Sequence, residues 1–397
     1  MPTITANVDG ATVIWKDKKR WFYPLALIIP MLPFGAHVLV QQTGLDIFWY
    51  LGPLWILIGI PLLDAIVGTE KSNPPAEVVA ELTEDRYYRV LTYLYLPIQY
   101  AGFFWAAWMV TNGGLNLFSK LGLALTVGAV GGIGIANAHE LGHKKEKIEK
   151  WLGKVVLAQT AYGHFEIEHN RGHHTRVATP EDPATSRFGE SFWRFLPRSV
   201  IGAARSGWEL ERKRFARIEK SPWQLDNDVL NAWAMTVALF GLTIGVFGTA
   251  VVPYLVIQAV FGFSLLEVVN YLEHYGLLRQ KDSTGKYERT QPWHSWNADH
   301  VVTNVLLYGL ERHSDHHANP TRRYQTLRTF DDAPQLPSGY GLMIGLAYIP
   351  PLWRKVMDHR VLDLYDGDLS RINVDPRNRA KVEARYGNAD LLHVGTA

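Results

Sequence analysis

The sequence predicts an all-α membrane protein in which six transmembrane helices carry a cytoplasmic cap rich in histidine. Of its 397 residues, 47% are hydrophobic, and long uncharged stretches alternate with strongly charged ones. Apolar runs of about 20 residues match the thickness of a bilayer. Basic residues gather on one side of these runs, and histidines gather in short motifs on that same side. These three observations together favour membrane spans joined to a polar region over a soluble core.

The predicted spans are six apolar segments: Trp21–Val40, Ile47–Leu63, Leu91–Val110, Leu121–Ala136, Ala232–Gly248 and Thr249–Leu266. The last two form one uncharged run that would be roughly 50 Å long as a single helix, well beyond a hydrocarbon core of ~30 Å. Gly245, Gly248 and Pro253 permit a break, so we expect a helical hairpin there. The N-terminus is basic and then apolar without a cleavage site, which favours a first span over a removable signal peptide.

Charge predicts the orientation of these spans. Of the 40 Lys and Arg residues, only Lys120 falls in the loops on the side opposite the N-terminus. The positive-inside rule therefore places the N-terminus in the cytoplasm, as expected for a bacterial inner membrane. The predicted organisation is a cytoplasmic segment 1–20, four spans within 21–136, a histidine-rich cytoplasmic region 137–231, two spans within 232–266, and a second histidine-rich region with a C-terminal extension, 267–397.

Composition excludes several classes of function. A net charge of +2 is too small for a typical nucleic-acid binder, and no basic helix is interleaved with aromatic residues. Cysteine is absent, so the chain has no disulfide and no thiolate to hold zinc, an iron–sulfur cluster or a rubredoxin-type iron. Any metal must be held by His, Asp or Glu.

Eight of the 15 histidines occur in three short motifs: His139-Glu-Leu-Gly-His143, His169-Asn-Arg-Gly-His173-His174 and His313-Ser-Asp-His316-His317. Residues three or four apart share one face of a helix, so each motif can direct two imidazoles at one point. The two members of each adjacent pair diverge by about 100° and can serve neighbouring sites. Eight imidazoles exceed the needs of one ion, which indicates two metals. His274, directly after the sixth span, is a ninth candidate.

The residue types narrow the choice of metal. Imidazole suits Zn, Cu, Fe and Ni, and zinc usually stops at four ligands. A binuclear site of many histidines beside an apolar bundle favours iron and oxygen chemistry, with copper as the open alternative. Acidic residues flank the candidate ligands and are expected either to accept their second N–H or to be solvated charges; they are Glu140, Glu168, Glu273, Glu311 and Asp315.

Four segments carry a resemblance to a known family: HELGHK, EHNRGHH, ERHSDHH and NYLEHYGL. They resemble the histidine boxes of the alkane 1-monooxygenase branch of the membrane-bound fatty-acid desaturase and hydroxylase superfamily, over the chain from the first span to about Arg323. The resemblance implies a non-haem di-iron centre held by His139, His143, His169, His173, His174, His274, His313, His316 and His317. It also implies insertion of one O₂ atom into the terminal methyl group of a medium-chain n-alkane. Electrons would come from rubredoxin, which is reduced by rubredoxin reductase.

Two other functions fit part of the pattern. A fatty-acyl desaturase or hydroxylase would use the same boxes on an acyl substrate. An intramembrane metalloprotease would use HELGH as a zinc motif with Glu140 as general base, but that hypothesis leaves seven of the nine histidines unexplained. A metal transporter would need ionisable residues within the spans, and only Asp64, near a span end, qualifies.

Two further predictions concern the substrate and the electron donor. Trp55 lies at the middle of the second span, roughly 15 Å along the helix axis from the metals. Facing inward, it would form the floor of an alkane channel; facing lipid, it would be a packing residue. A basic run adjoins the first histidine pair and either steers an acidic rubredoxin or binds lipid headgroups; it comprises Lys144, Lys145, Lys147, Lys150 and Lys154.

Overall fold

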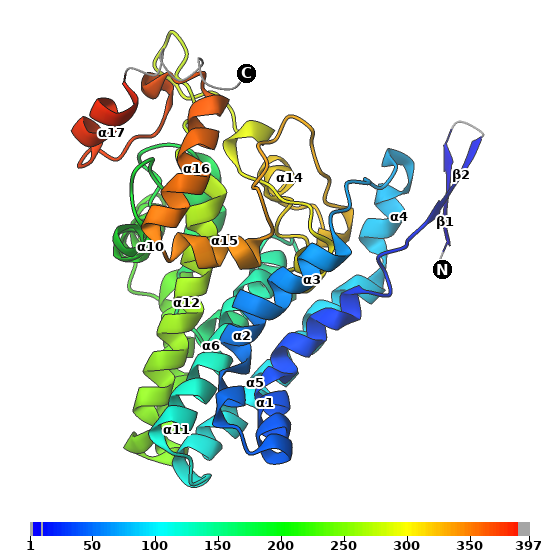
Figure 1. The fold of residues 1–397 in the computed structure, drawn as a ribbon, viewed down its shortest axis with the longest axis vertical. Coiled ribbons are helices and arrows are strands. Elements are labelled where there is room, and N and C mark those ends of the chain that lie inside the picture. The colour runs from blue at the N-terminus through cyan, green and yellow to red at the C-terminus, as the bar shows by residue number, and fades with distance from the viewer. Residues whose placement is uncertain (1–2, 9–10, 388–397) are drawn as a thin grey trace.

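The computed structural model describes residues 3–8 and 11–387, and it shows a bundle of long helices beneath a wider cap (Figure 1). The bundle consists of α1 (Ile28–Thr43), α2 (Leu51–Leu54), α3 (Ile60–Val67), α5 (Arg86–Asn112), α6 (Leu117–Gly142), α11 (Asp228–Phe247) and α12 (Val252–His274). The remaining helices, most of them in the cap, are α4 (Val79–Glu84), α7 (Lys147–Ala158), α8 (Phe165–Glu168), α9 (His174–Arg176), α10 (Phe192–Ala216), α13 (Val301–Leu306), α14 (His313–Ala318), α15 (Tyr340–Ala347), α16 (Pro350–Leu364) and α17 (Arg379–Tyr386).

Within the described residues, five helical stretches are long and apolar enough to cross a membrane: Tyr23–Thr43, Asp46–Val67, Leu117–Gly142, Asp228–Phe247 and Thr249–His274. They correspond to five of the six predicted spans, with ends that differ by a few residues. The other predicted span lies in α5, which has 27 residues but is less apolar because it carries several tyrosines and Gln99. Gln99 is buried and donates to Gln159 at 2.8 Å, and α5 packs against α1 and α6.

The break expected in the last apolar run is confirmed. α11 ends at Phe247, and Gly248 has a φ of 74°, in the left-handed region that favours glycine. A short 3-10 turn, Thr249–Val251, then leads into α12. The second span has an irregularity that the sequence analysis did not predict, a π-helical turn at Trp55–Gly59 between α2 and α3.

The central helix of the bundle is α6, which packs closely against α12. A Cβ at Gly128 would lie 2.7 Å from the carbonyl oxygen of Gln258, and one at Gly132 would lie 2.9 Å from the carbonyl oxygen of Gly262. Glycine is therefore required at these positions, because it lets the two backbones approach to contact distance, as is usual between membrane helices. This close packing fixes the relative positions of the C-terminal ends of α6 and α12.

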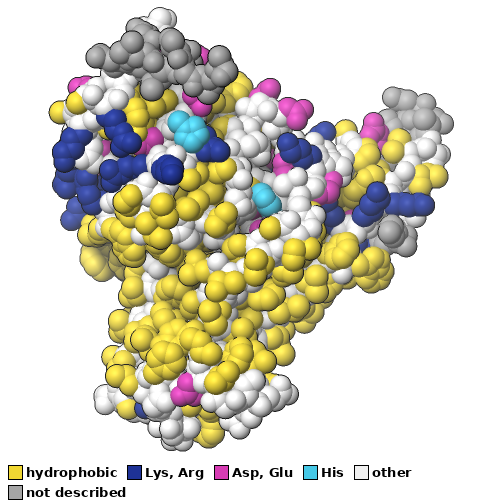
Figure 2. Space-filling view, viewed as in Figure 1, with side chains coloured by type: hydrophobic (Ala, Val, Ile, Leu, Met, Phe, Trp, Pro, Cys, Tyr) yellow, Lys and Arg dark blue, Asp and Glu magenta, His cyan; other side chains and the backbone are white. Residues whose placement is uncertain are grey.

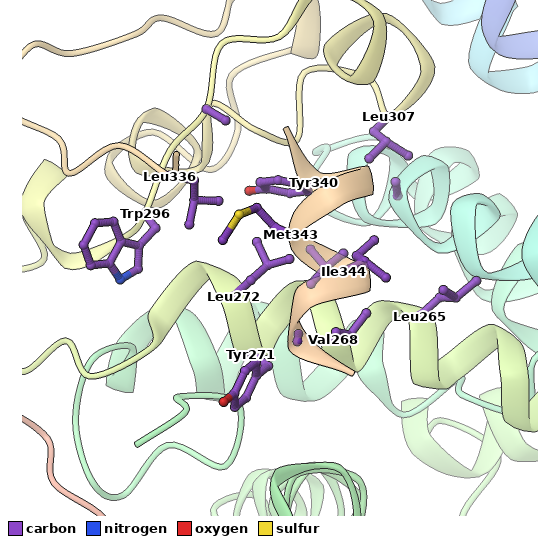
Figure 3. Packing of buried hydrophobic residues seen from close by; sticks show 14 of the residues in the cluster. Leu265, Val268, Tyr271, Leu272, Trp296, Leu307, Leu336, Tyr340, Met343 and Ile344 are labelled. Carbon is purple, nitrogen blue, oxygen red and sulfur yellow. The ribbon is translucent and has the colours of Figure 1, made fainter. Parts of the chain in front are cut away.

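The cap packs on the bundle through apolar side chains. Leu265, Val268 and Leu272 of α12 lie beside Met343 and Ile344 of α15 in one buried cluster (Figure 3). On the face shown in Figure 2, hydrophobic side chains cover the bundle, whereas Lys and Arg gather over the cap. The distribution matches an apolar segment within lipid and a charged segment outside it.

The N-terminal segment contains a β-hairpin that the sequence analysis did not predict. Two antiparallel strands, β1 (Thr3–Val8) and β2 (Ala11–Lys16), pair with Thr3 opposite Lys16. β-branched residues recur in both strands, which favours extended structure. The hydropathy pattern does not reveal this hairpin, because the segment is short and polar.

The close packing of α6 and α12 can be tested at Gly128. We expect Gly128→Ala to destabilise the bundle by about 1–3 kcal/mol, because the added methyl group has no space, and to lower the midpoint of thermal unfolding in detergent. Gly241 of α11 is the matched control, since a Cβ there would meet nothing within 4 Å. Gly241→Ala should leave the midpoint unchanged or raise it slightly. Equal midpoints for the two variants would contradict the packing.

Candidate metal centre

Nine histidines of the described chain gather where the bundle meets the cap, and they form two groups. The first group comprises His139, His143, His169, His174 and His316; the second comprises His173, His274, His313 and His317. Within each group, one potential ligand atom of every residue lies within 4.8 Å of the others. The structure thus brings together all nine residues that the sequence motifs and the resemblance single out.

Helix ends position these side chains. The last turn of α6 carries His139, α12 ends at His274, and α14 begins at His313. The middle motif lies on α8, a π-helical turn at His169–His173, and α9. Each adjacent pair is divided between the groups, since the two neighbours point in directions about 100° apart. His173 belongs to the second group and His174 to the first; likewise His317 belongs to the second and His316 to the first.

Burial lowers the pKa of six imidazoles outside the candidate spans well below the ordinary histidine value, because a buried ring is poorly solvated when charged; they are His143, His169, His174, His313, His316 and His317. His173 differs: burial acts to lower its pKa, but the neighbouring Asp182 carboxylate raises it. A neutral imidazole keeps one nitrogen lone pair, which is the form that binds a metal.

The nitrogen atoms fit a metal in each group. His174 Nε2 lies 3.1 Å from His169 Nε2 and 3.0 Å from His316 Nε2, and the Nε2 atoms of His313 and His317 are 2.9 Å apart. Buried Nε2 atoms without a hydrogen-bond partner in the described structure occur at His139, His143, His173 and His274. Buried polar atoms are normally satisfied. Lone pairs that converge in this way are satisfied by cations that prefer imidazole.

Asp182 fixes the orientation of one of these rings. His173 Nδ1 lies 2.8 Å from Asp182 Oδ2, so the ring donates its N–H to the carboxylate and keeps Nε2 free for the group. Burial favours the neutral acid, but the neighbouring His173 and the Thr185 hydroxyl lower the pKa of Asp182 to about 2. The carboxylate is therefore ionised. Sequence reasoning missed Asp182, because it follows His173 by nine residues and belongs to no motif.

Of the five acidic residues expected near the ligands, Glu273 alone contacts a histidine of the two groups in the described structure. Its Oε2 lies 3.2 Å from His313 Nε2, and its Oε1 accepts from the Tyr340 hydroxyl at 2.8 Å. The other four bond elsewhere: Glu140 to Lys144 at 2.9 Å, Glu168 to Arg176 at 2.7 Å, Glu311 to Asn304 at 3.0 Å, and Asp315 to Arg322 at 2.6 Å.

The contacts of Glu140 also bear on the metalloprotease hypothesis. Glu140 is buried in an ion pair with Lys144 and accepts from the Tyr324 amide at 3.4 Å. A general base in an HExxH site must face the metal-bound water. Glu140 instead pairs with Lys144 and the Tyr324 amide, so the geometry disfavours hydrolysis.

A cavity of about 440 Å³ opens from the surface to the first group, with His143 and His174 among its lining residues. Lys147 and Lys150 also line it and are exposed, as is Lys145. The structure corrects the predicted basic run at two positions, Lys144 and Lys154. Both are buried, and they pair with Glu140 at 2.9 Å and with Asp228 at 2.6 Å, so neither presents a free charge to a partner.

A narrow apolar cavity lies on the bundle side of the histidines. Its lining residues include Ile133 and Ala136 of α6, Leu265 and Val269 of α12, and Ile344 of α15. Ala136 is about one turn before His139 on α6, and Val269 is about one turn before Glu273 on α12. The cavity therefore leads towards the metal centre.

Trp55 does not line this cavity, whereas the next residue, Ile56, does. The Trp55 side chain is partly buried and packs against the main core. Its ring covers Gly59, where a Cβ would lie 2.7 Å from the indole. Trp55 thus neighbours the cavity wall rather than forming it.

Comparisons with known proteins agree with this geometry. Residues 116–346 match the fatty acid desaturase family. Alkane 1-monooxygenase 1 of Alcanivorax borkumensis is 47% identical over 387 residues, which cover 97% of this chain and 95% of the relative. Alkane 1-monooxygenase of Pseudomonas putida is 47% identical over 371 residues, which cover 93% of this chain and 92% of the relative. This chain belongs to the alkane 1-monooxygenases of the fatty acid desaturase family.

The range that matches the fatty acid desaturase family contains all nine histidines. Similarity also extends beyond the alkane 1-monooxygenases. The hydroxylase component of a xylene/toluene monooxygenase of Pseudomonas putida is 26% identical over 321 residues, which cover 79% of this chain and 84% of that relative. Family membership and the converging imidazoles both support metal-dependent chemistry at this site.

The role of Asp182 can be tested by removing its charge. Asp182→Asn should weaken metal binding by roughly 10–100-fold, because an amide no longer fixes the His173 tautomer; retention of metal during chelator dialysis measures this. Asp358 is the control, a buried aspartate that accepts from Tyr275 and Tyr386, outside both histidine groups. Asp358→Asn should retain wild-type metal content. Equal retention by both variants would show that Asp182 does not support the site.

Proposed function

We propose that this alkane 1-monooxygenase relative is a non-haem di-iron enzyme that hydroxylates the terminal methyl group of medium-chain n-alkanes to 1-alkanols with O₂. The observation that carries the proposal is the convergence of two groups of imidazoles beside an apolar cavity whose walls come in part from α6 and α12, the helices that carry His139 and His274. An acyl desaturase or hydroxylase would need polar groups for a carrier or headgroup, whereas the cavity is lined almost entirely by apolar side chains.

The proposed topology has six spans, with α5 counted as the third, in a bacterial inner membrane. The N-terminal segment, the two histidine-rich regions and the C-terminal extension lie on the cytoplasmic side. Two observations support this arrangement: the distribution of Lys and Arg around the spans, and the apolar surface of the bundle (Figure 2). The packing of α5 beside α1 and α6 supports its inclusion as a span.

We propose that each histidine group holds one iron ion. The ligands would be the nine histidines, with His173 and His174 serving different ions, as would His316 and His317. Iron, when bound, supplies the oxidising chemistry that an unactivated methyl C–H bond requires, whereas zinc is redox-inactive. The imidazole donors suit iron and are all neutral when ligating.

The residues of the cavity bind and orient the substrate. An alkane has no polar group, so its binding free energy comes from apolar burial at about 0.8 kcal/mol per CH₂. Ile133, Leu265 and Ile344 supply apolar walls and exclude water. At the metal end, the Tyr340 hydroxyl donates to Glu273, so these polar groups satisfy each other and leave the cavity wall dry. A narrow passage presents the end of the chain, which explains terminal selectivity.

Electrons would come from rubredoxin, reduced in turn by rubredoxin reductase. The sequence has no cysteine to hold a rubredoxin-type iron, so a redox protein, separate or fused, would have to dock at the metal centre. The 440 Å³ cavity gives such a partner access to His143 and His174. The exposed charges of Lys145, Lys147 and Lys150 would steer an acidic partner to its mouth.

The metal assignment is tested by iron analysis of purified protein. We expect two iron ions per chain, and we expect His274→Ala to lower the iron content and to abolish most alkane turnover, because the second group loses one of its four imidazoles. His37 of α1 lies outside both groups, so His37→Ala should keep wild-type iron and activity. Full iron and activity in His274→Ala would remove that residue from the proposed ligand set.

The substrate cavity is tested by the chain length of the product. Trp55 adjoins the cavity wall at Ile56, so Trp55→Ser should open space there and allow longer alkanes to be hydroxylated, with iron content and octane turnover largely kept. Trp108 of α5 is half exposed on the bundle surface and serves as control. A product profile that is the same in wild type, Trp55→Ser and Trp108→Ser would show that Trp55 does not limit substrate length.

The docking site is tested by charge reversal. Changing Lys147 and Lys150 together to Glu should slow reduction by rubredoxin, and the effect should be largest at low salt, where charges are least screened. Lys120→Glu, at the opposite end of the bundle, should not change the rate. A double variant whose reduction rate matches wild type at every salt concentration would exclude electrostatic steering at this cavity.

A further inference from the structure

A series of redox-active side chains connects the protein surface with the region of the first histidine group. It consists of Trp21, Tyr87, Tyr88, Tyr324 and Tyr308. Successive ring centroids are 6.5, 5.4, 5.7 and 5.2 Å apart. The outer member, Trp21, is 64% exposed. At the inner end, the Tyr324 amide donates to Glu140, the residue that follows His139.

The series consists only of Tyr and Trp, as does the buried cluster of Tyr271, Tyr275 and Trp353, but the series begins at an exposed ring. Every member is Tyr or Trp, the aromatic side chains that can give up an electron. Aromatic pairs that pack against each other deeper in the bundle include phenylalanine, as at Phe103 and Phe104, 5.3 Å apart, and at Phe34 and Trp105, 5.1 Å apart. Packing alone needs only the rings. The buried hydroxyls add polar contacts to the rings: Tyr88 donates to Asp17, and Tyr324 donates to the Tyr88 carbonyl at 3.2 Å.

A proton acceptor lies within the series. The Tyr88 hydroxyl donates to the carboxylate of Asp17, and both residues are buried. Burial raises the pKa of Asp17, which makes its carboxylate a better base. A phenol loses an electron far more easily when a base takes its proton at the same time. Tyr88 is therefore the member of the series that can hold an oxidising equivalent as a tyrosyl radical.

We propose that this series carries oxidising equivalents from the metal centre to the protein surface when O₂ has reacted and the cavity holds no alkane. The inference rests on the proposed function, since a strongly oxidising iron centre is the oxidant. Tyr88 gives one electron to that centre and its proton to Asp17, which leaves a neutral tyrosyl radical and a carboxylic acid. A soluble thiol at Trp21 then supplies one electron. Asp17 returns its proton to Tyr88, the thiol proton enters water, and two thiyl radicals join as a disulfide.

The chemistry of phenols sets the direction of transfer. Tyrosine yields electrons only to strong oxidants, so the series does not serve delivery from a weak reductant such as rubredoxin. Electrons from rubredoxin would instead enter at the cavity beside His143 and His174. The series therefore protects the buried histidines, which would otherwise be the nearest oxidisable groups.

The test uses iron-loaded protein with reduced rubredoxin and O₂, without alkane. Rapid freezing and electron paramagnetic resonance should show a tyrosyl radical, and mass spectrometry should find oxidised Trp21. Tyr88→Phe and Tyr324→Phe keep the rings but should lose most of the radical signal and shift oxidation to the histidines. Dithiothreitol should lower the oxidation of Trp21, and octane should suppress the radical. Tyr254→Phe, a buried tyrosine of α12 that donates to the Phe103 carbonyl, should behave as wild type.

Two results would overturn the inference: a wild-type enzyme that hydroxylates octane but forms no tyrosyl radical, or Tyr88→Phe and Tyr324→Phe proteins with the wild-type signal and wild-type oxidation sites. Failure of the proposed function looks different, because octane would then give no 1-octanol with iron-loaded wild-type protein.

Discussion

Convergence of nine imidazole rings at the end of an apolar bundle is the constraint that the other parts of the structure serve. Their lone pairs converge within each group, and cations that prefer imidazole would satisfy them. α6, α12 and α14 deliver ligands from their ends, and the π-helical turn at His169–His173 brings the middle motif to both groups. Asp182 accepts the Nδ1–H of His173 and so fixes the tautomer of that ring.

The same helices that carry ligands also build the substrate cavity. Gly128 and Gly132 let α6 approach α12, and the residues that follow along both helices line the cavity before they reach His139 and His274. Under the proposed function, one packing interface would set both the metal positions and the path of the alkane. Helix α15 of the cap forms one wall of the cavity, because it places Ile344 and Tyr340 against α12 (Figure 3).

Local patterns predicted much of this arrangement. The apolar runs and the break at Gly248 are properties of short segments, and the spacing of the histidines places them on helix faces without knowledge of the fold. Contacts between distant segments were not predictable in this way. Asp182 reaches His173 through a loop, Lys154 is neutralised by Asp228, and Glu273 alone of the flanking acids meets a ligand. The π-helical turn at Trp55–Gly59, where the indole covers Gly59, is not encoded by hydropathy.

The most direct test of the account is turnover of octane with ¹⁸O₂ by the iron-loaded protein and its redox partners. The proposed di-iron centre beside the apolar cavity should yield 1-octanol in which each molecule carries one ¹⁸O atom. Octene as the main product would instead indicate a desaturase. Alcohol labelled from water, or alcohols at internal carbons, would contradict oxygen insertion at a chain end presented by the cavity.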